Sequence, residues 1–444
     1  MKIFKKSCLA LVCAYAATSA SALDLLQAYE AALTQDATYH AARLAADAGR
    51  ENLPQARAQL MPSVSAAFSR NRNLLDTISP NSLGQLADSR ANYPSNSNSV
   101  TLRQPIYRRY QWAQYQQAQA QVDDVNAVLD FSTQNLAVNV AGAFFDALLA
   151  GEQLALIATQ LENYRTQLDA ARKIFEAGSG TRTDIDEVQS RLDMSVAQEL
   201  EARQNVDYTR QQLQVFVNQP VDSLSAVDVS KLELLSPVPT SAEAWVERAE
   251  QASPELRVLR ARVEQSRFEV EKARAGHYPT LDAVAQWSRN GSENNQSINT
   301  TYESRSVGLQ LNVPIFAGGG VSSTVRQAVA NEAKAAQQLE AGRRDLSVRV
   351  LKEFRGVTEG VLKVRAMEQA VRSSEQTLLS SQKSFQAGSR TRLDILNAQS
   401  NRMVALRDLA QARYMYLMAT LRLKALAGEA DIAAVAAINA NFQP

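Results

Sequence analysis

The sequence predicts a mixed, mainly α-helical fold in which long coiled-coil helices alternate with pairs of β-strands. Three observations lead to this prediction. Two long stretches contain no proline, segments of alternating apolar and polar residues precede each stretch, and the whole arrangement occurs twice in the 444 residues. With 45% hydrophobic residues the chain is not intrinsically disordered. Its net charge of +1 gives no reason to expect nucleic-acid binding.

The first residues have the features of a secretory signal peptide. A start with three lysines precedes an apolar run over residues 8–17, and Ala20 and Ala22 form an Ala-x-Ala cleavage site. We therefore expect residues 1–22 to be removed, which leaves a mature chain without cysteine. An uncleaved anchor helix is one alternative, but the run is shorter than the roughly 20 residues that cross a membrane. Acylation of Cys13 is another, but the residue before it is larger than such sites normally have.

Two stretches without proline, between 106 and 219 and between 315 and 443, predict long helices. Proline inside a helix costs about 3 kcal/mol, so its absence over such lengths permits unbroken helix. Apolar residues recur every seven positions in both stretches, which is the spacing of a coiled-coil seam. These residues are Leu154, Leu161, Leu168 and Phe175, and then Val364, Val371, Leu378 and Phe385.

From these patterns we expect helices at 108–177, 182–218, 321–387 and 391–427. The first would be about 105 Å long at 1.5 Å per residue. The alternative is the core stripe of an ordinary helical bundle, but globular helices average only about 11–12 residues. The length therefore favours the coiled coil.

The two stretches are copies of each other. A shift of 210 residues places the heptad residues of the first on those of the second. The match is closest where 173–185 (KIFEAGSGTRTDI) aligns with 383–395 (KSFQAGSRTRLDI). We therefore expect a tandem repeat. Its parts are a first repeat over 23–220, a linker over 221–241, a second repeat over 242–430 and a tail over 431–444.

Four segments that precede the long helices alternate between apolar and polar residues. This period of two is typical of β-strands with one apolar face. We expect strands at 62–73, 98–107, 279–290 and 304–316. Segments rich in Asn and Ser, at about 72–97 and 290–303, are expected to be exposed loops. The apolar face would consist of Val64, Phe68, Leu102, Leu281, Ala285, Leu309 and Val313.

An exported chain with four strands leaves several architectures open. No later stretch has 18 consecutive apolar residues, which predicts no transmembrane helix. The chain is then soluble in the periplasm, secreted, or held in a membrane as a β-barrel, and two hairpins packed on a soluble domain are one interpretation of the strands. Four strands cannot close a membrane barrel, because the smallest have about eight. In a membrane, several chains would have to share one barrel, and three chains would give twelve strands.

The signal peptide, the duplication and the paired turns together resemble the TolC family of trimeric outer-membrane channel-tunnels. The resemblance covers residues 23–430. Its most specific part is the motif Ala-Gly-Ser-x-Thr-Arg-x-Asp-Ile, which occurs at 177–185 and at 387–395. The family fold implies a twelve-stranded barrel from three chains and a long helical tunnel into the periplasm. It also implies an entrance that opens when a periplasmic adaptor and an inner-membrane transporter, of the ABC or RND type, dock.

The resemblance implies an entrance constriction and docking tips near the two turns. Asp394 matches an aspartate of the ring that narrows the family's entrance. Asn397 stands where a second ring aspartate often occurs, so this entrance would be less negative. The expected docking tips for the adaptor are Ala177, Gly178 and Ser179, and Ala387, Gly388 and Ser389.

The resemblance also implies a latch that keeps the entrance closed. Arg390, Thr183 and Asp184 match positions whose hydrogen bonds and ion pairs hold the family's entrance shut. Phe385 replaces a tyrosine of that network, so one latch hydrogen bond would be missing. Without the family, these charges would be interpreted as solvated helix ends.

Catalysis, a cofactor and a metal are not expected. The sequence has no G-x-S-x-G, Gly-x-x-x-x-Gly-Lys or H-E-x-x-H motif, and two histidines are too few for a His-based metal centre. The predicted function is a passive exit duct for efflux or type I secretion in the outer membrane of a Gram-negative bacterium, surrounded by lipid and powered by its partners. Sequence leaves the cargo open, with a slight preference for type I secretion as well as efflux. The alternative is a periplasmic coiled-coil scaffold without a pore, which would be recovered as a soluble monomer.

Overall fold

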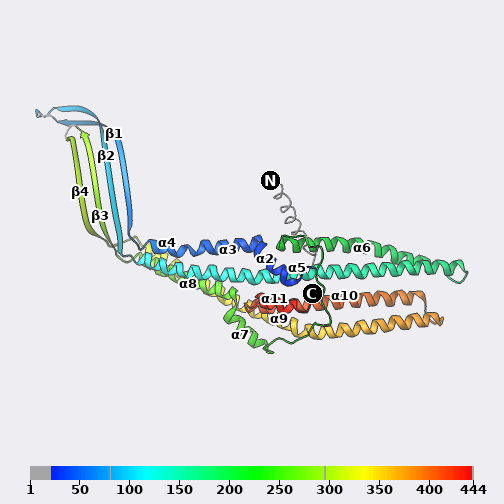
Figure 1. The fold of residues 1–444 in the computed structure, drawn as a ribbon. Helices are drawn as coiled ribbons and strands as arrows, with labels where there is room; N and C mark the ends of the chain where they lie inside the picture. Colours follow the sequence, from blue (N-terminus) through cyan, green and yellow to red (C-terminus); the bar gives the residue numbers. More distant parts are fainter. Residues whose placement is uncertain (1–21, 81, 295–296, 443–444) are drawn as a thin grey trace, which may run out of the picture. The chain divides into compact units, whose positions relative to one another are not determined.

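A computed structural model describes residues 22–80, 82–294 and 297–442, and describes no side chains over 293–299. The predicted signal peptide lies outside the described residues, except for Ala22. The elements, labelled in Figure 1, are α2 (Leu25–Gln35), α3 (Ala37–Arg50), α4 (Asn52–Ala58), β1 (Ser63–Pro80), β2 (Leu86–Tyr107), α5 (Arg109–Glu176), α6 (Arg182–Val217), α7 (Ala242–Ala252), α8 (Pro254–Ala275), β3 (Thr280–Asn294), β4 (Ser297–Asn312), α9 (Gly320–Gln386), α10 (Arg392–Leu426) and α11 (Ile432–Asn439).

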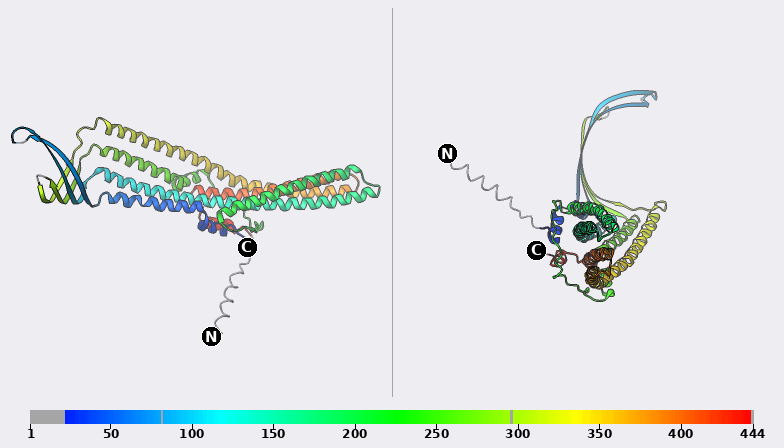
Figure 2. Two further views of the ribbon diagram at one scale, coloured as in Figure 1. Left: turned by 90° about the horizontal axis from the view of Figure 1, so that it is seen from above. Right: turned by 90° about the vertical axis from the view of Figure 1, so that its right-hand side faces the viewer.

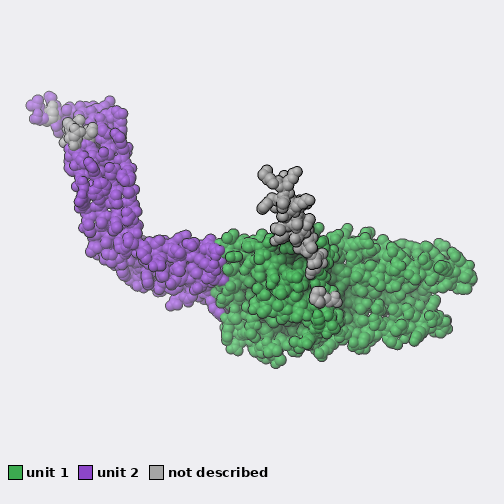
Figure 3. Space-filling model, in the orientation of Figure 1, with its two compact units in different colours: residues 1–44, 127–257, 341–444 green, residues 45–126, 258–340 purple. Residues whose placement is uncertain are grey.

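The chain forms two compact units, and each takes segments from both halves of the sequence. Unit 1 comprises Met1–Leu44, Ala127–Arg257 and Ala341–Pro444, and unit 2 comprises Ala45–Asn126 and Val258–Glu340 (Figure 3). The four long helices begin and end within one residue of the expected ranges. The element order β–β–long helix–helix occurs twice, and the paired helices have 68 and 67 residues and then 36 and 35.

Unit 2 contains one antiparallel sheet in the order β1-β2-β3-β4. The strands are longer than expected, because the ladder of β1 and β2 runs from Ser63 opposite Arg103 to Pro80 opposite Leu86. The expected loop over 72–97 is therefore wrong, and most of 290–303 also belongs to strands. Asn and Ser are poor strand formers by composition alone, but strand preference depends on pairing with neighbours, which here is continuous.

The end of the fourth strand also differs from the expectation. β4 ends at Asn312 instead of continuing to 316. The chain then leaves the ladder and reaches Gly318 and Gly319, whose positive φ angles of 59° and 80° turn it into α9. Val313 consequently lies just outside the sheet.

Unit 1 packs the long helices into two antiparallel hairpins, α5 with α6 and α9 with α10 (Figure 2). Four aromatic rings join α5, α10 and the C-terminal segment: Phe144 and Phe145 contact Phe442, and Phe145 stacks on Tyr414 with ring centroids 5.7 Å apart. One 18-residue window of α5 has a mean hydropathy of 1.5, enough to cross a membrane by length and composition, yet 44% of it is buried. We assign these apolar residues to the helical core.

The linker and the expected tail are both ordered parts of unit 1. Leu23 pairs with Leu224, and Val227 pairs with Phe442, in isolated β-bridges. The Tyr416 hydroxyl accepts a hydrogen bond from the backbone N–H of the linker over 2.9 Å, at Leu235. The expected tail over 431–444 contains the helix α11, which contacts α2 and α10. The linker is thus held against α10 and against segments from both ends of the described chain.

Candidate functional site

The two predicted tips share one backbone design. In each, the helix ends in a Schellman turn around a glycine with positive φ, 79° at Gly178 and 75° at Gly388. At the first tip Gly178 N donates to the carbonyl of Phe175 over 2.9 Å, and Ser179 N donates to that of Ile174 over 3.1 Å. Gly388 and Ser389 repeat both bonds. A Cβ at either glycine would meet no atom within 4 Å, so both turns are open to solvent.

The next helix begins at each tip with a reciprocal capping box. Thr181 Oγ1 accepts from Asp184 N over 3.2 Å, and the Asp184 carboxylate accepts from Thr181 N over 3.1 Å. Thr391 and Asp394 form the same box at α10, with the carboxylate accepting from Thr391 N and Oγ1, each over 2.9 Å. The duplicated Thr-x-x-Asp sequence therefore has a local structural role in both copies.

Asp394, the expected constriction residue, is partly exposed at the start of α10. Hydrogen bonds from Thr391 lower the pKa of its carboxyl below the ordinary 3.8, with a further contribution from the positive charge of Arg390. Only Oδ2 takes part in the capping bonds. The side chain is thus an ionised carboxylate at neutral pH that caps its helix and keeps Oδ1 outside those bonds.

Asn397, the other expected constriction residue, lies one turn further along α10 and is exposed. Arg191 of α6 donates to its Oδ1 over 2.8 Å. Asn397 therefore joins two helical hairpins within one chain, a contact that the sequence pattern did not indicate.

The expected latch residues do not meet within one chain. Arg390 donates to Ser381 Oγ over 3.4 Å, on the preceding helix, whereas Asp184 is engaged by Thr181. Thr183 is exposed. Among the described contacts of the chain, none joins Arg390 to Thr183 or Asp184.

Phe385, which stands where the expected latch has a tyrosine, makes a cation–π contact with an arginine. The Arg392 guanidinium carbon lies 5.5 Å from the centre of the Phe385 ring. Arg392 also donates to the backbone carbonyl of Gln167 on α5 over 3.4 Å. The aromatic side chain thus helps to direct α10 towards the first hairpin.

Helix α10 is fastened to the first hairpin by a small core that sequence reasoning missed. Leu396, 1% exposed, packs with Tyr164 and Leu168 of α5 and Val188 of α6. Gln167 donates to Gln399 Oε1 over 2.6 Å beside this core. Leu168 belongs to the heptad seam, so its burial could be expected. A single sequence does not show which helices contribute the other residues of this core.

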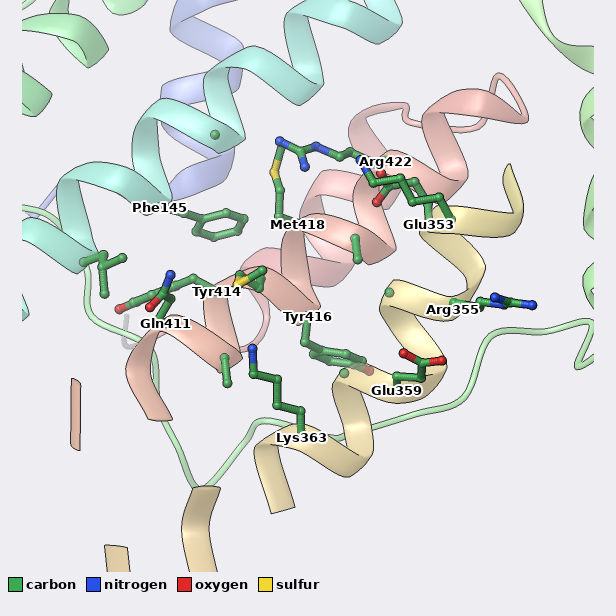
Figure 4. A pocket seen from close by; sticks show the side chains of 18 of the residues that line it. Phe145, Glu353, Arg355, Glu359, Lys363, Gln411, Tyr414, Tyr416, Met418 and Arg422 are labelled. Carbon is green, nitrogen blue, oxygen red and sulfur yellow. The ribbon is translucent and has the colours of Figure 1, made fainter. Parts of the chain in front are cut away.

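A large pocket of about 1060 Å³ opens between α5, α9 and α10 of unit 1 (Figure 4). Phe145, Tyr414 and Tyr416 line it together with charged side chains such as Glu353 and Lys363. Phe145 precedes the tip at residue 177 by roughly 48 Å of helix, so the pocket is separate from the predicted entrance. Across the described residues, no group of three or more His, Cys, Asp and Glu side chains could hold a metal ion.

The register places the expected apolar face on one side of the sheet. Val64 lies opposite Leu102, Leu102 opposite Ala285, and Leu309 opposite Ala283, so these residues share a face. Phe68 and Leu281 follow on the same face at even spacings along their strands. Val64, Phe68 and Leu309 are 67%, 74% and 70% exposed in the single chain. That this face meets lipid remains a prediction.

The other face of the sheet is polar and holds a charged cluster that the sequence analysis did not identify. Asp282, with a side chain only 2% exposed, pairs with Arg103 of β2 and with Arg108, which precedes α5. Arg108 Nε donates to Asp282 Oδ1 over 2.8 Å. The cluster ties β3 to the end of β2, on the face that carries Ser65, Thr101, Gln286 and Ser306.

Comparisons with known proteins agree with this architecture. The family model described as "Outer membrane efflux protein" matches residues 21–219 and 245–429. The alkaline protease secretion protein AprF of Pseudomonas aeruginosa is 34% identical over 424 residues, which cover 95% of this chain and 88% of that protein. The outer membrane protein TolC of Escherichia coli is 29% identical over 432 residues, covering 94% and 84%.

A solved structure shows the same fold. The CmeC outer membrane channel of Campylobacter jejuni superposes with a TM-score of 0.80 at 14% identity, over 94% of this chain and 90% of that one. The chain is thus an outer-membrane protein, and it belongs to the outer membrane efflux protein family, the TolC family that its duplicated turns resemble.

Proposed function

We propose that three copies of this chain form an outer-membrane exit duct for type I secretion or efflux, closed at the helical tips until partner proteins dock. The observation that carries the proposal is the four-stranded sheet of unit 2, which has one apolar face, one polar face and two open edges.

The open edges support a barrel that several chains share. β1 and β4 are the edge strands of the sheet, and each is paired on one side only in the described chain. Unpaired backbone groups are not tolerated in lipid, so each edge must meet another strand there. Joining β4 of one chain to β1 of the next, three times, closes twelve strands, within the size range of membrane barrels.

The boundary between the apolar and polar parts of this face indicates strands tilted as a membrane barrel requires. On the apolar face, each strand changes from apolar to polar at a defined step: Phe68 to Arg70, Val100 to Asn98, Trp287 to Arg289 and Val307 to Arg305. Across the sheet this boundary shifts in one sense by four residues, about 13 Å along the strands over about 14 Å across them. The resulting angle of about 40° equals the usual strand tilt in membrane barrels.

The tips support an entrance that partners can open. Both turns are exposed, and a Cβ at their glycines would meet no neighbour, so a helical hairpin of a periplasmic adaptor can approach the backbone closely. Because Arg390 and Asp184 do not meet within the chain, we place the latch between Arg390 of one subunit and Asp184 of the next. Three copies of Asp394 would then surround the axis and favour cations.

The cargo proposal follows the more similar relative. AprF, by its name, serves the secretion of an alkaline protease. We therefore favour a secreted protein, exported with an ABC-type transporter and its adaptor, over small toxic molecules. A deletion strain that loses a secreted protein from the medium but keeps its drug resistance would support this choice, and the opposite pattern would reject it.

Two neighbouring residues on opposite faces of β4 test the barrel. Leu309→Arg places a charge on the apolar face and should cost about 2–4 kcal/mol if that face meets lipid. Gln310→Arg places the same charge on the polar face and should be tolerated. Heat-modifiable trimer in outer-membrane fractions is the measurement, and we expect a large loss for Leu309→Arg only. Equal amounts of trimer from both variants, or a soluble wild-type monomer, would reject the proposed duct.

A further inference from the structure

Beyond the apolar band of the sheet, four arginines gather on the same face. We name Arg70, Arg72, Arg289 and Arg305 the arginine belt. Arg289 lies opposite Asn98, which lies opposite Phe68, and Arg70 follows Phe68 two residues along β1. Arg305 lies opposite Trp287, the last apolar residue of β3 on this face. The belt therefore follows the edge of the band on β1, β3 and β4, and Asn98 occupies the corresponding place on β2.

The belt has an excess of positive charge. Glu303 pairs with Arg305 over 2.7 Å and accepts a hydrogen bond from Trp287 Nε1 over 3.1 Å. In the part of the chain that the structure describes, neither Arg70 nor Arg289 forms an ion pair. Four arginines and one glutamate give a net charge of +3 for each chain, and three chains in a barrel would triple it. Exposed guanidinium groups at this density attract anionic groups.

A polar hollow of about 210 Å³ adjoins the belt at Arg70, the one belt residue among its lining side chains. Arg70, Asn96 and Thr301 line it, and Gly291 forms part of its wall. A Cβ at Gly291 would lie 2.5 Å from Asn96 Oδ1, so the missing side chain leaves room for the asparagine amide over β3. Guanidinium, amide and hydroxyl donors together suit a phosphate group, which guanidinium binds with two parallel hydrogen bonds.

The position of the hollow identifies the source of the phosphate. The belt begins where the apolar band ends, and Phe68 and Trp287 mark that edge as interfacial aromatic residues do. It lies towards the hairpin ends at 80–86 and 294–297, at the end of the sheet away from its connections to α4 and α5. With the helices in the periplasm, as the proposed function requires, the belt reaches the outer leaflet.

We propose that the arginine belt binds phosphate groups of the glycolipid headgroups in the outer leaflet. The inference rests on the proposed barrel, because only an embedded sheet presents the belt at headgroup level. Long arginine side chains can extend from the edge of the apolar band to the polar layer while their aliphatic stems remain over the band. The bound lipid would fix the depth and orientation of the barrel.

Lipid binding by purified full-length trimers tests the belt. The belt variant carries Arg70→Gln, Arg289→Gln and Arg305→Gln. The matched control carries Arg43→Gln, Arg326→Gln and Arg365→Gln, three exposed arginines of the helices. The probe is fluorescent lipopolysaccharide, intact or stripped of its lipid A phosphates. We expect intact lipid to bind the belt variant at least about fivefold more weakly than wild type, with the control unchanged. Arg→Lys at the three belt positions should recover part of the binding, because charge remains but the two-bond geometry is lost.

Several outcomes would overturn the inference. Equal binding of intact lipid by the belt variant and the control would do so, and so would equal binding of phosphorylated and dephosphorylated lipid by wild type. Displacement of the lipid by millimolar inorganic phosphate would instead indicate a site for a free anion. Failure of the proposed function is distinguishable, because the wild-type chain would then give no heat-modifiable trimer at all.

Discussion

The first and second tips have the same backbone and different surroundings. At the first tip Arg182 pairs with Asp186 in its own helix, over 3.3 Å, and both side chains are largely exposed. At the second, Arg392 lies over Phe385 and donates to Gln167 of the first hairpin. Duplication thus preserved the turn, which depends on local hydrogen bonds, while the side chains that face other helices diverged.

The difference extends one turn into the following helix. With the shift of 210 residues, buried Leu396 of α10 corresponds to exposed Asp186 of α6. Asn397 likewise corresponds to Glu187, and Asn397 receives the hydrogen bond from Arg191. The second tip is therefore joined to the first hairpin through the core around Leu396, against which Ile185 of α6 also packs, whereas Arg182 and Asp186 of the first tip pair within α6. We infer that movement of the entrance requires release of the second tip.

The largest expected effect comes from bulk at the second turn. Gly388→Trp should leave trimers intact and abolish export, because the side chain would block a docking partner and the positive φ disfavours any Cβ. Gly388→Asn is the control for backbone strain, since asparagine tolerates this conformation, and should retain most export. Secreted protein in the medium, with trimer measured in parallel, decides the outcome. Normal export by Gly388→Trp would remove this turn from the docking surface.

A smaller effect is expected from the corresponding pair in the following helices. Leu396→Ala should destabilise the tip by about 2–4 kcal/mol, since it empties a core of Tyr164, Leu168 and Val188. Asp186→Ala removes an exposed ion pair and should change stability by less than about 0.5 kcal/mol. Hydrogen exchange of tip amides measures both. Equal losses of protection would show that the two tips are fastened alike.

The smallest effect concerns the caps and their dependence on pH. Thr181→Ala and Thr391→Ala should each cost about 1 kcal/mol, because each removes a capping hydroxyl. The pKa of Asp394 is lowered by Thr391, so its ionised form contributes stability above the ordinary pKa of 3.8 and loses it as the pH falls through the lowered value. Thr391→Ala should raise this pKa.

The pH dependence of ion selectivity distinguishes the effect of the Thr391 cap from that of the Thr181 cap. The acid loss of cation preference should move to higher pH in Thr391→Ala, because the carboxylate of Asp394 would then take up a proton more readily. Thr181→Ala should leave the titration of selectivity in place. Identical shifts in both variants would contradict a special role for Asp394 at the entrance.

Local sequence patterns predicted much of this fold. Contacts between segments far apart in the sequence could not be predicted from them. The heptads and the absence of proline placed both ends of the four long helices within one residue, since both patterns depend on the helix itself. The Asn-rich ends of the strands were missed, because strand preference depends on cross-strand pairing, here within the hairpin of β1 and β2, more than on composition. At the tips, the motif indicated the turns at Gly178 and Gly388, whereas the bond of Arg191 to Asn397 depends on how two hairpins pack. The proposed latch between subunits stays a prediction from the resemblance, since Arg390 and Asp184 do not meet within one chain.

Single-channel conductance in planar bilayers tests the central claim, that the second tip holds the entrance closed against a neighbouring subunit. The variant is Arg390→Ser with Asp184→Ala, and the matched control is Arg182→Ser with Asp186→Ala, which removes an ion pair inside one helix of the first tip. We expect the first pair to raise conductance, because it releases the contact between subunits in all three places, and the control to match wild type. Unchanged conductance in the first pair, or an equal rise in the control, would contradict the account.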